Sequence, residues 1–190
     1  MHRWLPLALL ASAAAGCQRE PRRLDSVPPE LQGRVDAARA ATGELKKALS
    51  GRLQQAMQAG GPAAGIDVCA DEAAKLTAGV ASARGVTLGR TSHRLRNPAA
   101  SAPRPWLRAY LDEVSSRPAA EARPAVFDLG SSLGIAEVLP TQALCLACHG
   151  DPAKLSPEVS ARLRARYPDD RAVGFAEGDV RGVVWVEIPK

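Results

Sequence analysis

Residues 145–149 read Cys-Leu-Ala-Cys-His, and no other part of the sequence limits the possible structures as strongly. Two thiols separated by two residues can add to the two vinyl groups of a haem, and the histidine that follows is then brought beneath the iron. The motif therefore predicts one covalently bound haem c, attached through Cys145 and Cys148, with His149 as the proximal iron ligand. Aromatic residues make up only 4% of the chain, so a large flat cofactor could fill a core built mainly from Leu, Val and Ala.

Other sites built on a Cys-x-x-Cys pair fit this sequence less well. A structural zinc site would also need Cys69, but Cys148 and His149 are neighbours, and neighbours rarely both reach one tetrahedral ion. A thioredoxin-like redox pair is disfavoured because Pro152 and Pro157 follow closely, where such a pair needs a helix. A simple disulfide would leave His149 without a role.

The N-terminus reads as a secretion signal. After a short basic start, residues 4–15 form an apolar stretch that is too short to span a bilayer, and small residues precede Cys17. This is the lipoprotein cleavage pattern, so we expect residues 1–16 to be a signal peptide and Cys17 to carry lipid at the mature N-terminus. The alternative is a plain signal peptide cut near Ala15, which would leave Cys17 as a free thiol.

Either kind of signal would export the protein, and the lipid would anchor it to a membrane on the periplasmic side of the cell envelope. Gln18, rather than an aspartate, follows the cysteine, which favours the outer membrane. Residues 17–29 are charged and contain prolines, as in a flexible tether, and residues 30–190 are long enough for one domain. The net charge is +5, but the basic residues are scattered among acidic ones, so we expect no nucleic-acid partner.

Hydrophobic periodicity predicts mainly helices in the first half of the chain and mainly strands in the second. Apolar residues recur at steps of three and four over residues 30–58, which predicts a long amphipathic helix that Gly60-Gly61-Pro62 ends. Further helices are expected over residues 63–83, from 105 and over 157–166, and strands over 85–92, 125–129, 134–139 and 181–188. Helices followed by antiparallel-type strands, without strict alternation of the two, predict an α+β fold.

The second axial position of the iron decides what the haem does. The remaining candidate ligands are Met57, Cys69 and His93. Cys69 shares the inward face of the second expected helix with Ile66, and a thiolate there would stabilise ferric iron. Most lone cysteines are small buried hydrophobic residues, however, and the residues alone leave both interpretations open. His93 lies in a polar loop, where a solvated histidine is ordinary.

Arg90, Arg94 and Arg96 are close together in the sequence at the start of that loop. A planar guanidinium group matches the geometry of a carboxylate, so these side chains could pair with the haem propionates. Surface arginines are common, and the pattern is therefore not specific.

Several separated motifs resemble, in the same order, those of the monohaem c-type cytochrome domain with a PAS-like fold. They are Gly89-Arg90-Thr91-Ser92, Arg96-Asn97-Pro98, Pro103 with Trp106, the haem motif with Gly150, Tyr167-Pro168-Asp169-Asp170, Gly174-Phe175, Gly178-Asp179 and Arg181-Gly182. The resemblance implies an antiparallel sheet flanked by helices, in a solitary exported protein or a sensory module. It also implies His/Cys axial ligation, and Cys69-Ala70-Asp71-Glu72-Ala73 matches the family's Cys-x-x-x-Ala context.

Three functions are compatible with this reading of the sequence. We expect an electron carrier or redox sensor whose axial positions are closed by His149 and Cys69, and which serves an unidentified redox partner protein. The alternative is a sensor of gases or small ligands, in which Cys69 leaves the iron on reduction. A peroxidase-like enzyme would need His93 as its distal acid and base, and we expect no enzymatic activity.

Overall fold

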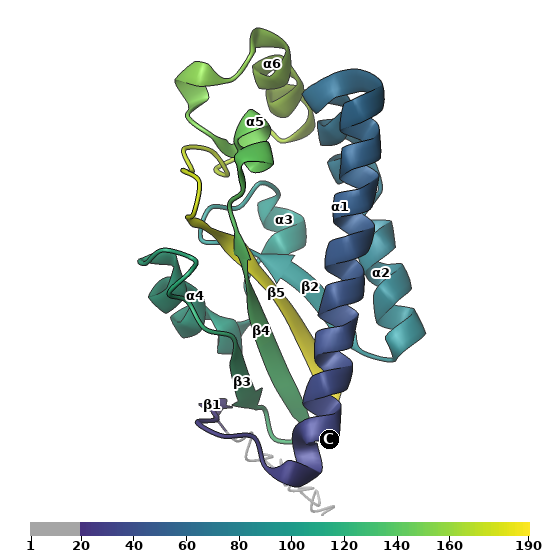
Figure 1. The fold of residues 1–190 in the computed structure, drawn as a ribbon, viewed down its shortest axis with the longest axis vertical. Coiled ribbons are helices and arrows are strands. Elements are labelled where there is room, and N and C mark those ends of the chain that lie inside the picture. The colour runs from purple at the N-terminus through teal and green to yellow at the C-terminus, as the bar shows by residue number, and fades with distance from the viewer. Residues whose placement is uncertain (1–19) are drawn as a thin grey trace, which may run out of the picture.

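A five-stranded antiparallel sheet forms the centre of the computed structural model, which describes residues 20–190 (Figure 1). Across the sheet the strands follow the order β1-β3-β4-β5-β2. Their bounds are Arg22–Arg23 (β1), Thr87–Thr91 (β2), Ala125–Asp128 (β3), Ser132–Pro140 (β4) and Val180–Pro189 (β5). The two long strands, β4 and β5, are paired along nearly their whole length, with one register irregularity between Leu139 and Pro140.

Both faces of this sheet are buried, so alternate residues of one strand enter different apolar clusters. In β5, Val184 and Val186 belong to one cluster, whereas Val183 and Trp185 belong to the other. Side chains on a strand point alternately to the two faces, and a strand covered on both sides needs apolar residues at every position. This explains why residues 183–186 form a continuous apolar run.

Two helices, α1 (Pro29–Asp71) and α2 (Ala73–Arg84), pack on the first face of the sheet. Val35, Ala38 and Leu45 on α1 are fully buried against the strands, and Val80 of α2 joins the same cluster. In Figure 1, α1 runs along the whole length of the molecule, beside the strands and beyond the end of the sheet. Its last turns are therefore available to build a site outside the sheet.

The long element α1 consists of two helices that meet at a kink, where Gly60 and Gly61 have non-helical backbone angles, so the expected boundary at these glycines is confirmed. Gly61 has φ 69° and ψ −170°, a combination that essentially only glycine adopts. Pro62 starts the next segment, where its missing N–H group costs little. The second expected helix, over residues 63–83, is present after this kink: its first part is the end of α1 and, after an interruption at Glu72, the remainder is α2.

The second face of the sheet is covered by the short helix η1 (Pro105–Leu107) and by α4 (Arg108–Ser115). Leu107, Leu111 and Val114 are buried on this face, next to Phe127 of β3. The expected helix from residue 105 is thus present, with a 3₁₀ turn as its first part.

The segment that carries the Cys-x-x-Cys-His motif lies beyond the end of β4 (Figure 1). It consists of short helices: η2 (Ala143–Cys145), α5 (Leu146–His149), η3 (Pro152–Lys154) and α6 (Pro157–Arg166). Val159 and Leu163 of α6 pack against Ile66 near the end of α1, with Cys148 partly buried at the edge of this cluster. The small cluster therefore joins the motif to the last turns of the long helix.

The expected fold class is confirmed: the protein is α+β, with a PAS-like antiparallel sheet, flanking helices and a long N-terminal helix. Arg22 and Arg23, in the segment expected to be a tether, pair with Phe127 and Asp128 of β3, so regular structure begins before residue 30. The expected signal peptide and the lipidation site at Cys17 lie outside the described residues. No helix within residues 20–190 is both long and apolar enough to cross a bilayer.

Candidate cofactor site

A cavity of about 590 Å³ lies between the last turns of α1, the ends of β2 and β5, and the Cys-x-x-Cys-His segment. Its volume is within the range of about 300–1,000 Å³ that is usual for sites of small molecules and cofactors. Cys145, Cys148 and His149 line it, and so does Cys69. The motif and the lone cysteine of α1 therefore share one cavity, although they are far apart in the sequence.

The motif is held in a tight turn. The backbone N–H of Cys145 donates to Gln142 O at 2.8 Å, and that of Gly150 donates to Leu146 O at 3.0 Å. A Cβ atom at position 150 would lie 2.7 Å from the same carbonyl oxygen of Leu146, so the turn requires glycine there. The short helix α5 therefore ends directly after His149.

Nδ1 of His149 lies 2.7 Å from the carbonyl oxygen of Ala172. An imidazole that donates from Nδ1 to a carbonyl group keeps its Nε2 lone pair free, which is the usual arrangement of a metal-binding histidine. Burial lowers the pKa of His149 to about 2, and the positive charges of Arg181 and Arg96 act in the same direction. The ring is therefore neutral at physiological pH, the form that binds metal ions.

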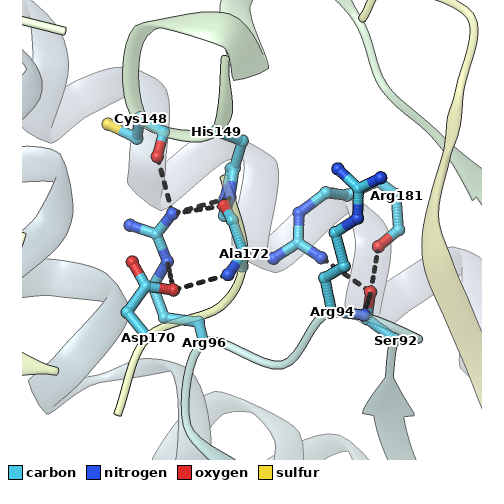
Figure 2. A network of polar contacts seen from close by, with 8 residues as sticks. All are labelled: Ser92, Arg94, Arg96, Cys148, His149, Asp170, Ala172 and Arg181. Carbon is cyan, nitrogen blue, oxygen red and sulfur yellow. Dashed lines mark hydrogen bonds and ion pairs between the residues drawn. The ribbon is translucent and has the colours of Figure 1, made fainter. Parts of the chain in front are cut away.

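Arg96 lies against this histidine rather than in open solvent (Figure 2). Its Nη2 donates to Cys148 O at 2.6 Å and to Ala172 O at 2.9 Å, and its Nε lies 3.3 Å from Asp170 Oδ1. The guanidinium group also lies over the ring of Tyr167, with its Cζ 5.8 Å from the ring centroid. One side chain thus joins the loop after β2 to the motif and to the segment before β5.

The thiol of Cys69 is free and accessible, and the space that it meets is the cavity. Protein atoms nevertheless surround most of it, and this burial raises the pKa of the thiol, while the charges of Arg90, Arg96 and Arg181 lower it in part. Cys69 was expected to point inward. Its position in the wall of a cavity, rather than in a closed apolar cluster, leaves the sulfur available to a ligand.

The three arginines considered for propionate binding have different surroundings. Arg90 lines the cavity, and its side chain forms no hydrogen bond or ion pair with the part of the chain that the structure describes. Arg96 also lines the cavity, but it is bound to Asp170 and to carbonyl groups of the motif and of the segment before β5. Arg94 lies outside the lining, donates to the carbonyl groups of Val173 and Gly174, and stacks on a phenylalanine ring.

Sequence reasoning gave no role to Arg181, whose side chain also lines the cavity. Burial lowers its pKa to about 10, with Arg96 and Arg90 adding to the effect, and among the described residues its guanidinium donates only to Ser92 Oγ, at 3.1 Å. The only sequence signal for a role of Arg181 was the motif Arg181-Gly182 in the family resemblance. His93 lies outside the lining and meets Phe175 edge to face, with ring centroids 5.5 Å apart.

Within residues 20–190, no group of three or more His, Cys, Asp or Glu side chains has the geometry to hold a metal ion by itself. The four residues of the zinc alternative therefore do not form such a group. One histidine and several thiols line a large cavity instead. Such an arrangement suits a metal ion that is held by a larger organic group.

Comparison with known proteins agrees with this geometry. Residues 26–189 match the model of the Tll0287-like family. Among solved structures, the crystal structure of the cyanobacterial heme-protein Tll0287 is similar to this chain, with a TM-score of 0.62 and 25% sequence identity over 86% of this chain and 98% of that one. No curated protein matches the chain. Because the family match covers most of the chain, including every element that lines the cavity, the chain belongs to the Tll0287-like family.

Proposed function

We propose that this chain binds one haem c covalently through Cys145 and Cys148, with His149 as the proximal iron ligand and Cys69 as the second axial ligand. The protein acts in electron transfer or redox sensing. The observation that carries this proposal is that all four side chains line a single cavity. The solved relative is a heme-protein, which supports the same cofactor here.

The state of the cavity residues fits a haem group. Cys145 and Cys148 are free thiols, as thioether formation requires, and His149 is neutral with its Nδ1 bound to Ala172 O. The cavity is large enough for a sizeable cofactor, and its lining combines apolar side chains of α1 and α2 with a few polar groups. These features support covalent attachment and proximal ligation.

The charges around the cavity support an occupant that carries carboxylates. Arg90 and Arg181 line it, and neither forms an ion pair with any described residue. The described residues supply no carboxylate to either guanidinium group, so an anionic occupant of the cavity would give both of them a partner. A haem brings two propionate groups, and Arg90 and Arg181 are better placed to bind them than Arg94, which lies outside the lining.

When bound, the haem supplies a reversible one-electron change at its iron. His149 and Cys69 together would occupy both axial positions of the iron. An iron with two protein ligands favours electron transfer or redox sensing over the binding of small ligands. A peroxidase-like activity has less support, because His93 does not line the cavity.

Expression in a bacterium that carries a c-type haem maturation system tests the proposal. The purified protein should keep its haem after denaturation, as a mass increase and a haem-stained band, and the double variant Cys145→Ser/Cys148→Ser should not. Cys69→Ser is the matched control, because it also removes a thiol of the cavity. It should keep covalent haem but lose the thiolate character of the ferric absorption and paramagnetic resonance spectra.

Two results would contradict the proposal. Absence of covalent haem from the wild-type protein would exclude attachment at the motif. A high-spin ferric spectrum of the wild type, unchanged in Cys69→Ser, would exclude Cys69 as a ligand. Rapid binding of carbon monoxide by the reduced wild type would favour the gas-sensor alternative over electron transfer.

A proposal about the location rests on a separate part of the sequence. We propose that residues 1–16 direct export and that Cys17 is lipidated, so that the protein is held on the periplasmic side of the envelope, at the outer membrane. The support is the run of small residues before Cys17 and the glutamine after it. Cells fed radiolabelled palmitate should label the wild type but not Cys17→Ser, and label in Cys17→Ser would exclude this site.

A further inference from the structure

We propose that Arg96 is a positioning residue for the proximal histidine, which raises the reduction potential of the bound haem by holding positive charge and hydrogen-bond donors against His149 and its carbonyl partner. The inference rests on the proposed haem binding and deepens it. It gives Arg96 a role at the ligand instead of at a propionate.

The contact is buried and connects three segments of the chain. The side chains of Arg96 and Asp170 are only 12% and 11% exposed, so water screens their charges weakly. Figure 2 shows the guanidinium between Asp170 on one side and the carbonyl groups of Cys148 and Ala172 on the other. A charge in this position acts on His149 at short range.

The direction of each bond follows from the tautomer of His149 that would bind iron, in which Nε2 is free and Nδ1 carries the ring hydrogen. Nη2 of Arg96 carries two hydrogens and has three neighbours: Cys148 O at 2.6 Å, Ala172 O at 2.9 Å and His149 Nδ1 at 2.7 Å. The two carbonyl groups accept these hydrogens, because Nδ1 uses its own hydrogen to donate to Ala172 O. Ala172 O therefore accepts from both the histidine and the arginine.

Both consequences of this geometry act on the haem iron in the same direction. A carbonyl that already accepts a bond from a cation attracts the Nδ1 hydrogen of His149 less, so the imidazole keeps less negative charge and is a weaker electron donor. The cation itself disfavours the additional positive charge of ferric iron. Each effect stabilises the reduced state, so each raises the potential.

The negative charge of Asp170 opposes the positive charge of Arg96. A variant that removes it should therefore shift the reduction potential in the opposite direction. Oδ1 of Asp170 accepts the backbone N–H of Ala172 at 2.7 Å and also lies near Arg96 Nε. Asp170→Asn would remove the negative charge while an amide oxygen can still accept from Ala172. The positive charge at His149 would then be less compensated, and the potential should rise.

The test is redox titration of the haem-loaded protein and its variants. Arg96→Gln should shift the reduction equilibrium at least tenfold towards the ferric form, a fall of about 59 mV for a one-electron couple. Asp170→Asn should shift the equilibrium towards the ferrous form. Arg96→Lys keeps the charge but not the two-donor geometry of the guanidinium group, so its reduction potential should lie between those of wild type and Arg96→Gln. The paramagnetic resonance g values of ferric Arg96→Gln should also move, because they respond to the donor strength of the axial imidazole.

Arg171→Gln is the matched control, because Arg171 is next to Asp170 in sequence but its side chain is exposed. It should change the potential far less than Arg96→Gln does. Equal shifts in the two variants, or unchanged g values in Arg96→Gln, would overturn the inference while covalent haem remained in both. If Arg96→Gln does not take up haem, an unchanged potential in Asp170→Asn overturns it. A wild type without haem would instead overturn the proposed function.

Discussion

The indole Nε1 of Trp106 donates a hydrogen bond of 2.6 Å to Oε1 of Glu187. Trp106 lies in η1, on the second face of the sheet, and Glu187 is near the end of β5. Arg104 binds the same carboxylate through two further hydrogen bonds, of 2.8 and 2.6 Å. One acidic side chain therefore attaches the segment before α4 to the sheet.

Glu187→Gln should lower the free energy of unfolding at pH 7 by about 1 kcal/mol, because the pair with Arg104 is partly exposed. Burial raises the pKa of Glu187, but the hydrogen bonds from Arg104 and Trp106 outweigh it, and the pKa lies below 4.5. The carboxylate therefore stabilises the folded state above pH 4.5, and this stability is lost as the pH falls through the lowered pKa. The free energies of unfolding of Glu187→Gln and of the wild type should therefore become equal at acidic pH.

Urea unfolding at a series of pH values checks this expectation. Glu177→Gln is the control, because Glu177 is exposed and forms no ion pair with the described residues. Its stability should follow that of the wild type at every pH. A difference between Glu187→Gln and wild type that stays constant down to the lowest pH would contradict the proposed cause.

The kink in α1 predicts opposite effects for two similar substitutions. Gly61→Ala should cost about 1–3 kcal/mol, because an alanine there must adopt the backbone conformation that glycine tolerates. Gly51→Ala should stabilise the protein by about 0.5–1 kcal/mol, since Gly51 is inside regular helix and a Cβ there would meet nothing within 4 Å. Thermal unfolding of both variants measures the difference. Equal effects would mean that the kink does not depend on glycine.

A close backbone contact predicts a large effect at Gly182. A Cβ atom there would collide with the carbonyl oxygen of Thr91, which β2 and β5 hold in place by their pairing. Gly182→Ala should therefore cost about 1–3 kcal/mol through overpacking. Gly79→Ala, on the exposed side of α2, should be neutral or stabilising. Chemical denaturation of the two variants compares them, and a Gly182→Ala protein as stable as wild type would show that the strands can separate locally.

Local signals in the sequence explain which elements could be predicted from it. The helix over residues 157–166 has the expected bounds because Ser156 caps it, with its Oγ accepting from Val159 N, and Pro157 starts it. The last strand was evident from its run of valines. Strand β1 has only two residues, both arginines, and two charged residues carry no alternation to detect.

Some residues of the cavity could be predicted for the same reason, because they belong to local sequence patterns. The haem motif is a local pattern, and Cys69 was singled out because it follows the spacing of one helix face. The contacts of Arg96 could not be predicted, because they are made with backbone carbonyl groups of residues that are 52 and 76 positions away. A carbonyl group leaves no trace in a sequence, so a role that depends on carbonyl partners needs the folded structure.

The attachment of α6 to the cysteine-bearing end of α1 leads to a prediction about salt. Arg166 binds Asp71 and lies 3.6 Å from Asp67, and Arg162 binds Asp67 at 2.7 Å. These acidic residues flank Cys69 on α1, so the ion pairs hold its helix segment against α6. Arg166→Gln should lower the free energy of unfolding by about 1 kcal/mol in dilute buffer and by much less in 1 M salt, since screening weakens partly exposed pairs.

Arg164 gives the control, because it is on the same helix and exposed, and it forms no ion pair with the described residues. Arg164→Gln should leave stability nearly unchanged at both salt concentrations, as measured by thermal unfolding. A loss in Arg166→Gln that is the same in dilute buffer and in 1 M salt would mean that packing of the arginine stem, and not its charge, joins the two helices. A loss that disappears in salt would mean that charge pairing keeps the segment of Cys69 beside the Cys-x-x-Cys-His motif.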